Sequence, residues 1–186
     1  MNLKLKDIAQ IQSGVYAKPG KDGDVLYLQS GHIDDSGVIQ RNLQPSVALD
    51  HKLTNFILND GDILFSAKGN RNISVIYSSQ LGKAVASTTF LVLRPIGKNV
   101  LPEYLAWFLN HPRIQLFLKT HAKGASPPSI SKETLQDLQV EVPDIQTQKE
   151  ILLIHTLRKK EQQLIQQIEE LKEQSLQYRL YHSSTR

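Results

Sequence analysis

The sequence predicts an α+β fold, with a β-rich domain over residues 1–143 and one long helix over residues 144–186. Short runs of β-branched and aromatic residues, bounded by Gly, Asn, Ser or Pro, recur before position 143 and are typical of strands. After it, a segment without Pro or Gly carries a seven-residue repeat of apolar side chains, which is typical of a helix packed along another helix. The 186 residues, 40% of them hydrophobic, therefore suffice for one core and an extended helix.

Five strands are expected in the β-rich domain, over residues 24–29, 62–66, 73–77, 89–94 and 139–142. Residues 31–37, with two Gly and two Asp, are expected to form a loop. Residues 123–131 contain a Pro-Pro pair that interrupts both helices and sheets, so this segment is expected to be irregular.

Three shorter helices are expected before the long one. Two should begin at Pro102 and Pro112, because Pro is well tolerated in the first turn of a helix. A third, over 131–138, precedes the last predicted strand. No apolar run approaches the roughly 18 residues that span a membrane.

The long helix is expected over 146–181, a length of about 54 Å at roughly 1.5 Å per residue. That length exceeds the diameter of a small domain, so the helix needs a neighbour; folding back on its own domain is the alternative to pairing with another chain. Glu161 and Ser175 interrupt one apolar row, and polar residues in such a seam fix register. The residues expected at a dimer seam are Ile154, Leu157, Leu164, Ile168, Leu171 and Tyr178.

The positive charge is concentrated in the middle of the chain. Residues 63–132 carry nine Lys and Arg against the single acid Glu103, which gives a charge of +8, whereas both flanks carry two more acids than bases. Such a basic block is a plausible footprint for phosphate groups, and a scatter of solvated lysines is the alternative.

Sequence motifs of catalysis are absent. The chain has no Cys and its six His form no HExxH pair, so neither a metal nor a cofactor is expected. Gly14 and the Gly20–Lys21 pair are separated by five residues where a P-loop has four. Asp60 and Asp62 stand at the turn into a predicted strand and give little support to a hydrolytic site. The lack of Cys fits the reducing cytoplasm.

Five segments, in order along nearly the whole chain, together carry a family resemblance: Leu5–Gly14, Gly61–Asn70, Phe90–Pro95, Tyr104–Leu109 and Lys123–Leu152. With them the chain resembles the DNA specificity subunit of type I restriction-modification systems. The last segment is similar to the family's junction between a target recognition domain and a spacer helix.

The resemblance implies a non-catalytic subunit whose target recognition domain binds double-stranded DNA while the helix fixes distance and orientation. It implies methyltransferase (M) and restriction (R) subunits as partners, which carry out methylation and cleavage. A full-length member has two recognition domains and two spacer helices, and this chain has one of each. We therefore expect a homodimer with antiparallel helices that reads a bipartite target of inverted half-sites.

Three polar loops are expected to contact DNA. Asn70 and Arg71 are the best candidates for base edges, because Asn suits adenine and Arg suits guanine, while Lys68 and Lys123 suit phosphates. For each residue, a solvated surface position is the alternative. A coiled-coil dimeric adaptor that binds protein is the alternative function, and an enzyme is the third. The expected DNA-binding residues are Lys18, Lys21, Lys68, Asn70, Arg71, Asn72, Lys119, Lys123, Ser126 and Ser129.

Overall fold

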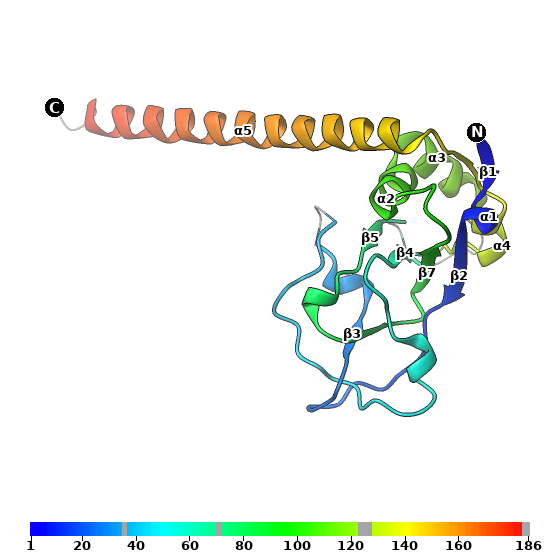
Figure 1. The fold of residues 1–186 in the computed structure, drawn as a ribbon. Helices are drawn as coiled ribbons and strands as arrows, with labels where there is room; N and C mark the ends of the chain where they lie inside the picture. The colour runs from blue at the N-terminus through cyan, green and yellow to red at the C-terminus, as the bar shows by residue number, and fades with distance from the viewer. Residues whose placement is uncertain (35–36, 70–71, 123–127, 184–186) are drawn as a thin grey trace. The chain divides into compact units, whose positions relative to one another are not determined.

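The computed structural model describes residues 1–34, 37–69, 72–122 and 128–183. The chain divides into two compact units, Met1–Gln148 and Lys149–Arg186 (Figure 1). The first unit combines short strands and helices, and the second continues helix α5 (Ile145–Ser183). The predicted α+β class, a β-rich domain followed by a long C-terminal helix, is confirmed.

The main sheet of the first unit has four antiparallel strands in the order β2-β7-β4-β5, which are Ala9–Ser13, Phe90–Pro95, Ile63–Ser66 and Ser74–Ile76. Ser13 of β2 and Phe65 of β4 both lie opposite Leu91 of β7. Because β2 and β4 run in the same direction on either side of β7, their C-terminal ends reach the same edge of the sheet. The loops that follow both strands therefore start from one edge.

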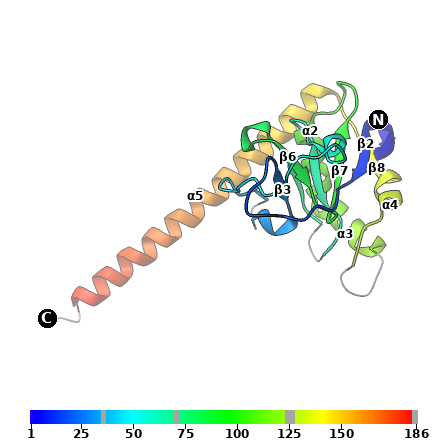
Figure 2. The ribbon, with the colours of Figure 1, turned by 90° about the horizontal axis from the view of Figure 1, so that it is seen from below.

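A second, parallel pair of strands forms a separate layer. β3 (Leu26–Leu28) pairs with β6 (Ala84–Ala86), and β3 lies below the main sheet in Figure 1 and in front of it in Figure 2. Leu26 packs in a core cluster with Leu64 of the main sheet, whereas Tyr27 packs in a second cluster with Val47. Alternate side chains of a strand point to opposite faces, so this pair joins two cores.

The opposite end of the unit is built from the two ends of its sequence. β1 (Asn2–Lys4) pairs antiparallel with β8 (Gln139–Glu141). Helices α1 (Leu5–Ile8) and α4 (Lys132–Gln136) contact each other beside this pair. The Lys4 ammonium lies 2.8 Å from the Asp137 carboxylate on the surface.

Two helices begin with Pro and contact each other, and the first of them packs against the sheet. α2 (Pro102–Asn110) contacts β5 and buries Leu105 and Leu109 completely. α3 (Pro112–His121) buries Leu118 and leaves most of its other side chains exposed. The Pro residues occupy first-turn positions, where no amide hydrogen bond is lost.

Helix α5 begins with a side-chain cap. The Asp144 carboxylate accepts hydrogen bonds from the Thr147 amide at 3.0 Å and from the Thr147 hydroxyl at 2.7 Å. One turn on, the fully buried Gln148 donates to the carbonyls of Asn99 and Pro143 and accepts from the Leu101 amide. These bonds satisfy backbone groups that a helix start and its neighbouring loop leave unpaired.

Candidate nucleic-acid interface

Two loops that lie far apart in the sequence meet in a short backbone ladder. Lys68 and Ser129 form an antiparallel bridge. Beside it, the Gly69 amide donates to the Pro128 carbonyl at 3.1 Å and the Ile130 amide donates to the Ala67 carbonyl at 2.8 Å. The Lys68 side chain is exposed and Ser129 is half-buried. The structure thus brings together residues from two of the three predicted loops.

Asn72 closes the first of these loops from inside. Its side chain is buried, and its amide nitrogen donates to the Ser66 carbonyl at 2.9 Å across the base of the loop. The Asn72 carbonyl accepts a 2.7 Å hydrogen bond from the Gln115 amide of α3. The Asn72 amide nitrogen is therefore occupied within the loop, and the role of Asn72 as a DNA contact stays a prediction.

Asn110, at the end of α2, fixes the strand that leaves the same loop. Its side-chain oxygen accepts from the Ser74 amide at 2.8 Å, and its nitrogen donates to the Ser74 carbonyl at 2.7 Å. Asn110 thereby occupies the backbone amide and carbonyl of Ser74 on β5, the outermost strand of the sheet. Sequence reasoning missed both Asn110 and Gln115, and no motif in the sequence marks them.

Lys119 lies on the exposed face of α3, the helix that Gln115 ties to Asn72. Lys68, Ser129 and Lys119 therefore come from three segments linked by hydrogen bonds. Asn70, Arg71, Lys123 and Ser126 lie outside the described residues.

A groove of about 300 Å³ lies beside Lys68. Asp34 contributes to it from a turn in which its carboxylate accepts a hydrogen bond from the Val38 amide at 2.9 Å. Ammonium, carboxylate and hydroxyl groups along one groove supply donors and acceptors of the kind that read base edges. The groove is lined by Ser30, Gly31, Ile33, Asp34, Ser66, Lys68, Gly69 and Ile73.

Lys18 and Lys21 lie on the loop that follows β2, and both are exposed. This loop leaves the sheet at the same edge as the Lys68 loop, and the Gly20 amide donates to the Ser46 carbonyl at 2.6 Å. Its backbone contacts thus differ from those of the Lys68–Ser129 ladder. The third predicted loop shares an edge with the other two without joining their hydrogen bonds.

Two carboxylates at the opposite edge, before the start of β4, have structural partners. Asp62, with a side chain only 1% exposed, receives two hydrogen bonds from the Arg94 guanidinium at 2.8 and 2.7 Å, and this pairing raises the pKa of Arg94. Asp60 accepts from the amide and hydroxyl of Ser79, which lowers the pKa of Asp60. Arg94 is thus one member of the basic block whose charge is paired within the chain. Among the described residues, no group of three His, Cys, Asp or Glu side chains converges on a metal position.

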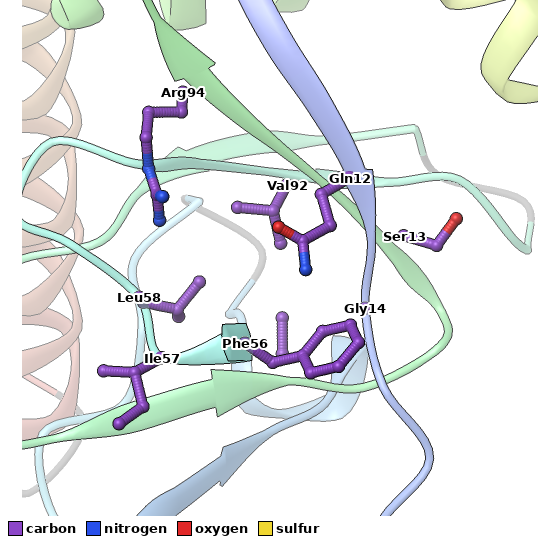
Figure 3. A pocket seen from close by; sticks show the side chains of 9 residues that line it. Gln12, Ser13, Gly14, Phe56, Ile57, Leu58, Val92 and Arg94 are labelled. Carbon is purple, nitrogen blue, oxygen red and sulfur yellow. The ribbon is translucent and has the colours of Figure 1, made fainter. Parts of the chain in front are cut away.

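A small cavity lies between β2, β7 and residues 56–58 (Figure 3). The polar ends of Gln12 and Arg94 point into it, and Gly14 and Phe56 line the side opposite Arg94. Its volume of about 10 Å³ is of the order that holds one water molecule. The cavity is too small for a nucleotide base or a cofactor.

The predicted seam residues of α5 are exposed along the helix. Ile154, Leu157, Leu164, Ile168, Leu171 and Tyr178 expose between 48% and 66% of their surface. Between these rows, polar side chains pair with one another, as Lys172 does with Glu169 at 2.8 Å. Such surface pairs stabilise a helix only weakly. The exposed apolar row is therefore the feature that indicates a packing partner.

Within the described residues, no helix is both long enough and apolar enough to cross a membrane.

Comparison with known sequences identifies relatives of the chain. The sequence model of a family described as Type I restriction modification DNA specificity domain matches residues 1–172. The HindI type I restriction enzyme specificity subunit of Haemophilus influenzae is 32% identical over 137 residues, which cover 72% of this chain and 28% of that protein. The MjaVIII specificity subunit of Methanocaldococcus jannaschii is 30% identical over 105 residues, 55% of this chain and 24% of the relative. The chain thus spans about a quarter of the length of these relatives.

Solved structures share the fold. The HsdS subunit from Thermoanaerobacter tengcongensis superposes with a TM-score of 0.62 at 16% identity, over 87% of this chain and 37% of that one. The S subunit of a type I restriction-modification system from M. genitalium superposes with a TM-score of 0.53 at 16% identity, over 87% and 39%. Together with the match over residues 1–172, these relatives show that the chain belongs to the family of type I restriction-modification DNA specificity domains.

Proposed function

We propose that the chain is a non-catalytic DNA-recognition subunit. The domain over residues 1–143 binds double-stranded DNA, and the helix over 144–186 pairs with a second copy and docks the methyltransferase and restriction subunits. The observation that carries the DNA-binding part is the Lys68–Ser129 ladder, which places an exposed cation on a loop fixed at both ends. A rigid base under a polar loop is what base and phosphate readout needs.

In this proposal the residues divide by chemistry. Lys68 and Lys119, with Lys18 and Lys21 on the neighbouring loop, neutralise phosphates and set the position of the domain on the duplex. Ser129 lies beside Lys68 and offers a hydroxyl to a base or phosphate. Asn70, Arg71, Lys123 and Ser126 keep the roles as DNA contacts that were proposed for them from the sequence.

The exposed apolar row of α5 supports the dimer. Two antiparallel copies bury Leu157, Leu164 and Leu171 of each chain against each other and place one recognition domain at each end of the pair. A two-fold axis across the helices then demands two identical half-sites in inverted orientation, with an unread spacer whose length the helices set.

The absence of a hydrolytic arrangement at Asp60 and Asp62 supports assigning chemistry to partner subunits. Both carboxylates are occupied by structural hydrogen bonds, and the cavity beside Arg94 admits no substrate. Methylation and cleavage therefore belong to subunits that this chain positions on DNA.

Binding of mixed-sequence duplex DNA by the purified chain, with and without the methyltransferase subunit of the same system, tests the proposal. We expect binding that weakens steeply with salt, because each neutralised phosphate contributes about −0.9 to the slope of log K against log salt. DNA binding that is undetectable both with and without the methyltransferase subunit contradicts the proposal. Binding of the methyltransferase subunit without any DNA binding by the mixture instead supports a coiled-coil adaptor.

A further inference from the structure

A buried tyrosine fixes the backbone on both sides of Tyr16. The Tyr27 hydroxyl donates to the Val15 carbonyl at 3.1 Å and accepts from the Ala17 amide at 3.4 Å. Val15 also forms a backbone bridge with Ser87, and Ala17 packs in the core cluster that contains the Tyr27 ring. The residue between two such anchors has little freedom to move its backbone.

The Tyr16 side chain itself is directed outward and is 78% exposed. Within the part of the chain that the structure describes, its ring stacks on no other ring and its hydroxyl has no hydrogen-bond partner. A single exposed aromatic is ordinary on a protein surface. The contacts of Tyr27 distinguish this one, because a buried hydroxyl holds the backbone on both sides of the exposed residue.

Glycine at both ends of the loop permits close packing against neighbouring backbone. A side chain at Gly14 would place a Cβ 2.1 Å from the Ser87 carbonyl oxygen, and one at Gly23 would place it 2.2 Å from the Val47 nitrogen. The loop therefore enters and leaves in close contact with neighbouring backbone. It presents Tyr16 three residues beyond Ser13, as Lys68 stands three residues beyond Phe65 on the other side of β7.

We propose that Tyr16 is a DNA-contact residue, whose ring packs against the bases or deoxyriboses of the duplex, and that Tyr27 is its positioning residue. This inference rests on the proposed function and adds an uncharged contact to the basic ones. Apolar and aromatic side chains that enter a groove pack against base steps and sugars, and a residue whose backbone is held in advance loses less entropy on binding.

The charges around Tyr16 favour DNA over a protein surface. Lys18 and Lys21 follow it with exposed side chains. Of the two acids in the loop, Asp24 is occupied because its carboxylate accepts from the Leu49 amide at 2.9 Å, which leaves Asp22. Phosphates and sugars alternate along a DNA strand, so neighbouring lysines can contact phosphates while the ring contacts a sugar or base between them.

Three variants of the full chain distinguish the contact made by Tyr16 from the positioning role of Tyr27. For each variant, affinity for mixed-sequence duplex DNA is measured with the methyltransferase subunit present. Tyr16→Ala should weaken binding about five- to fifty-fold, in line with aromatic contacts to bases, and leave the salt slope unchanged. Tyr16→Phe should bind as the unchanged chain does. Tyr27→Phe, which keeps the core ring, should weaken binding in the parent chain and have no further effect in a Tyr16→Ala chain.

A photo-crosslinking amino acid gives a second readout. Placed at position 16 it should crosslink to the duplex, whereas at Ile96 it should not. Ile96 is a matched control because it is 47% exposed and follows β7 at the opposite edge of the sheet.

Wild-type affinity of Tyr16→Ala with no crosslink overturns the inference and leaves the proposed function standing. Loss of methyltransferase binding with unchanged affinity of the chain for DNA overturns it in favour of a protein contact. If the unchanged chain binds no DNA at all, the proposed function and the inference fall together.

Discussion

The backbones of Lys68 and Ser129 pair in an antiparallel bridge, although the two residues stand at opposite ends of the basic middle segment. The bridge fixes the backbone position from which the Lys68 side chain extends into solvent. The buried amide of Asn72 holds the base of the same loop, and the amide of Asn110 holds Ser74 on the strand that follows it. A loop fixed in this way presents a charge at a defined place, which is what separates a recognition surface from a scatter of solvated lysines.

Lys68→Ala should weaken binding to duplex DNA and reduce the salt slope by about 0.9, because one phosphate contact is lost. Titration at several salt concentrations measures both quantities. Lys98→Ala is the matched control, since Lys98 is also exposed but follows β7 at the far edge of the sheet. Equal effects of the two variants would mean that the charge acts without regard to position.

Leu164→Gln together with Leu171→Gln should convert the dimer to a monomer, because both changes place polar groups in the exposed apolar row. Sedimentation at micromolar concentration measures the change, and circular dichroism checks that the helix remains, since Gln is a good helix former. Gln162→Ala with Glu169→Ala, spaced by the same seven residues on another face, should leave the dimer intact. A monomeric parent chain would contradict the dimer.

Gln148→Ala should lower the free energy of unfolding by about 1–3 kcal/mol, because the partly buried Leu101 amide then loses its hydrogen bond to the fully buried Gln148 side chain. Urea denaturation of the full chain gives this value. Gln162→Ala, at an exposed position of the same helix, is the control and should change it little. An unchanged midpoint for Gln148→Ala would mean that its three hydrogen bonds contribute nothing net.

The domain should lose stability in acid. Hydrogen bonds from Thr147 lower the pKa of Asp144, and the Lys4 ammonium lowers that of Asp137, both from a usual value of 3.8. A carboxylate with a lowered pKa stabilises the fold above its unfolded value and loses that contribution as pH falls through the folded value. The melting temperature should therefore fall as pH drops below 3.8, and less steeply in Asp144→Asn, which keeps a capping side chain without the charge. Equal slopes for the two chains would contradict a contribution from Asp144.

Much of the fold follows from local patterns. The strands predicted at 62–66 and 89–94 appear as β4 and β7, because runs of β-branched and aromatic residues suit a sheet buried on both faces. The helix predicted over 146–181 extends from Ile145 to Ser183. Heptad spacing and the lack of Pro and Gly are sufficient signals for a helix of that length.

The elements that escaped prediction depend on distant partners. β1 has three residues and exists because it pairs with β8 at the other end of the unit. β6 is Ala84–Ala86, and the two Ala residues that flank its single Val have weak strand preference, so the strand depends on β3 alongside it in the core. A prediction made from a few neighbouring residues cannot include these pairings with distant strands.

The candidate site divides in the same way. Basic and polar loops are visible in the sequence, and Lys68, Lys119 and Ser129 belong to segments that the structure ties together. Their proximity was not predictable, because it depends on a ladder and on the Gln115 amide. The hydrogen bond by which Asn72 closes its loop was not predictable for the same reason, since sequence does not distinguish an amide offered to a ligand from one that closes a loop.

Selection of bound sequences from a randomised pool of duplex DNA, using the full chain with its methyltransferase subunit, tests the central claim most directly. We expect recovery of two identical half-sites in inverted orientation, separated by a spacer of constant length and free sequence. Recovery of a single half-site, of two unrelated half-sites, or of no sequence preference would contradict it.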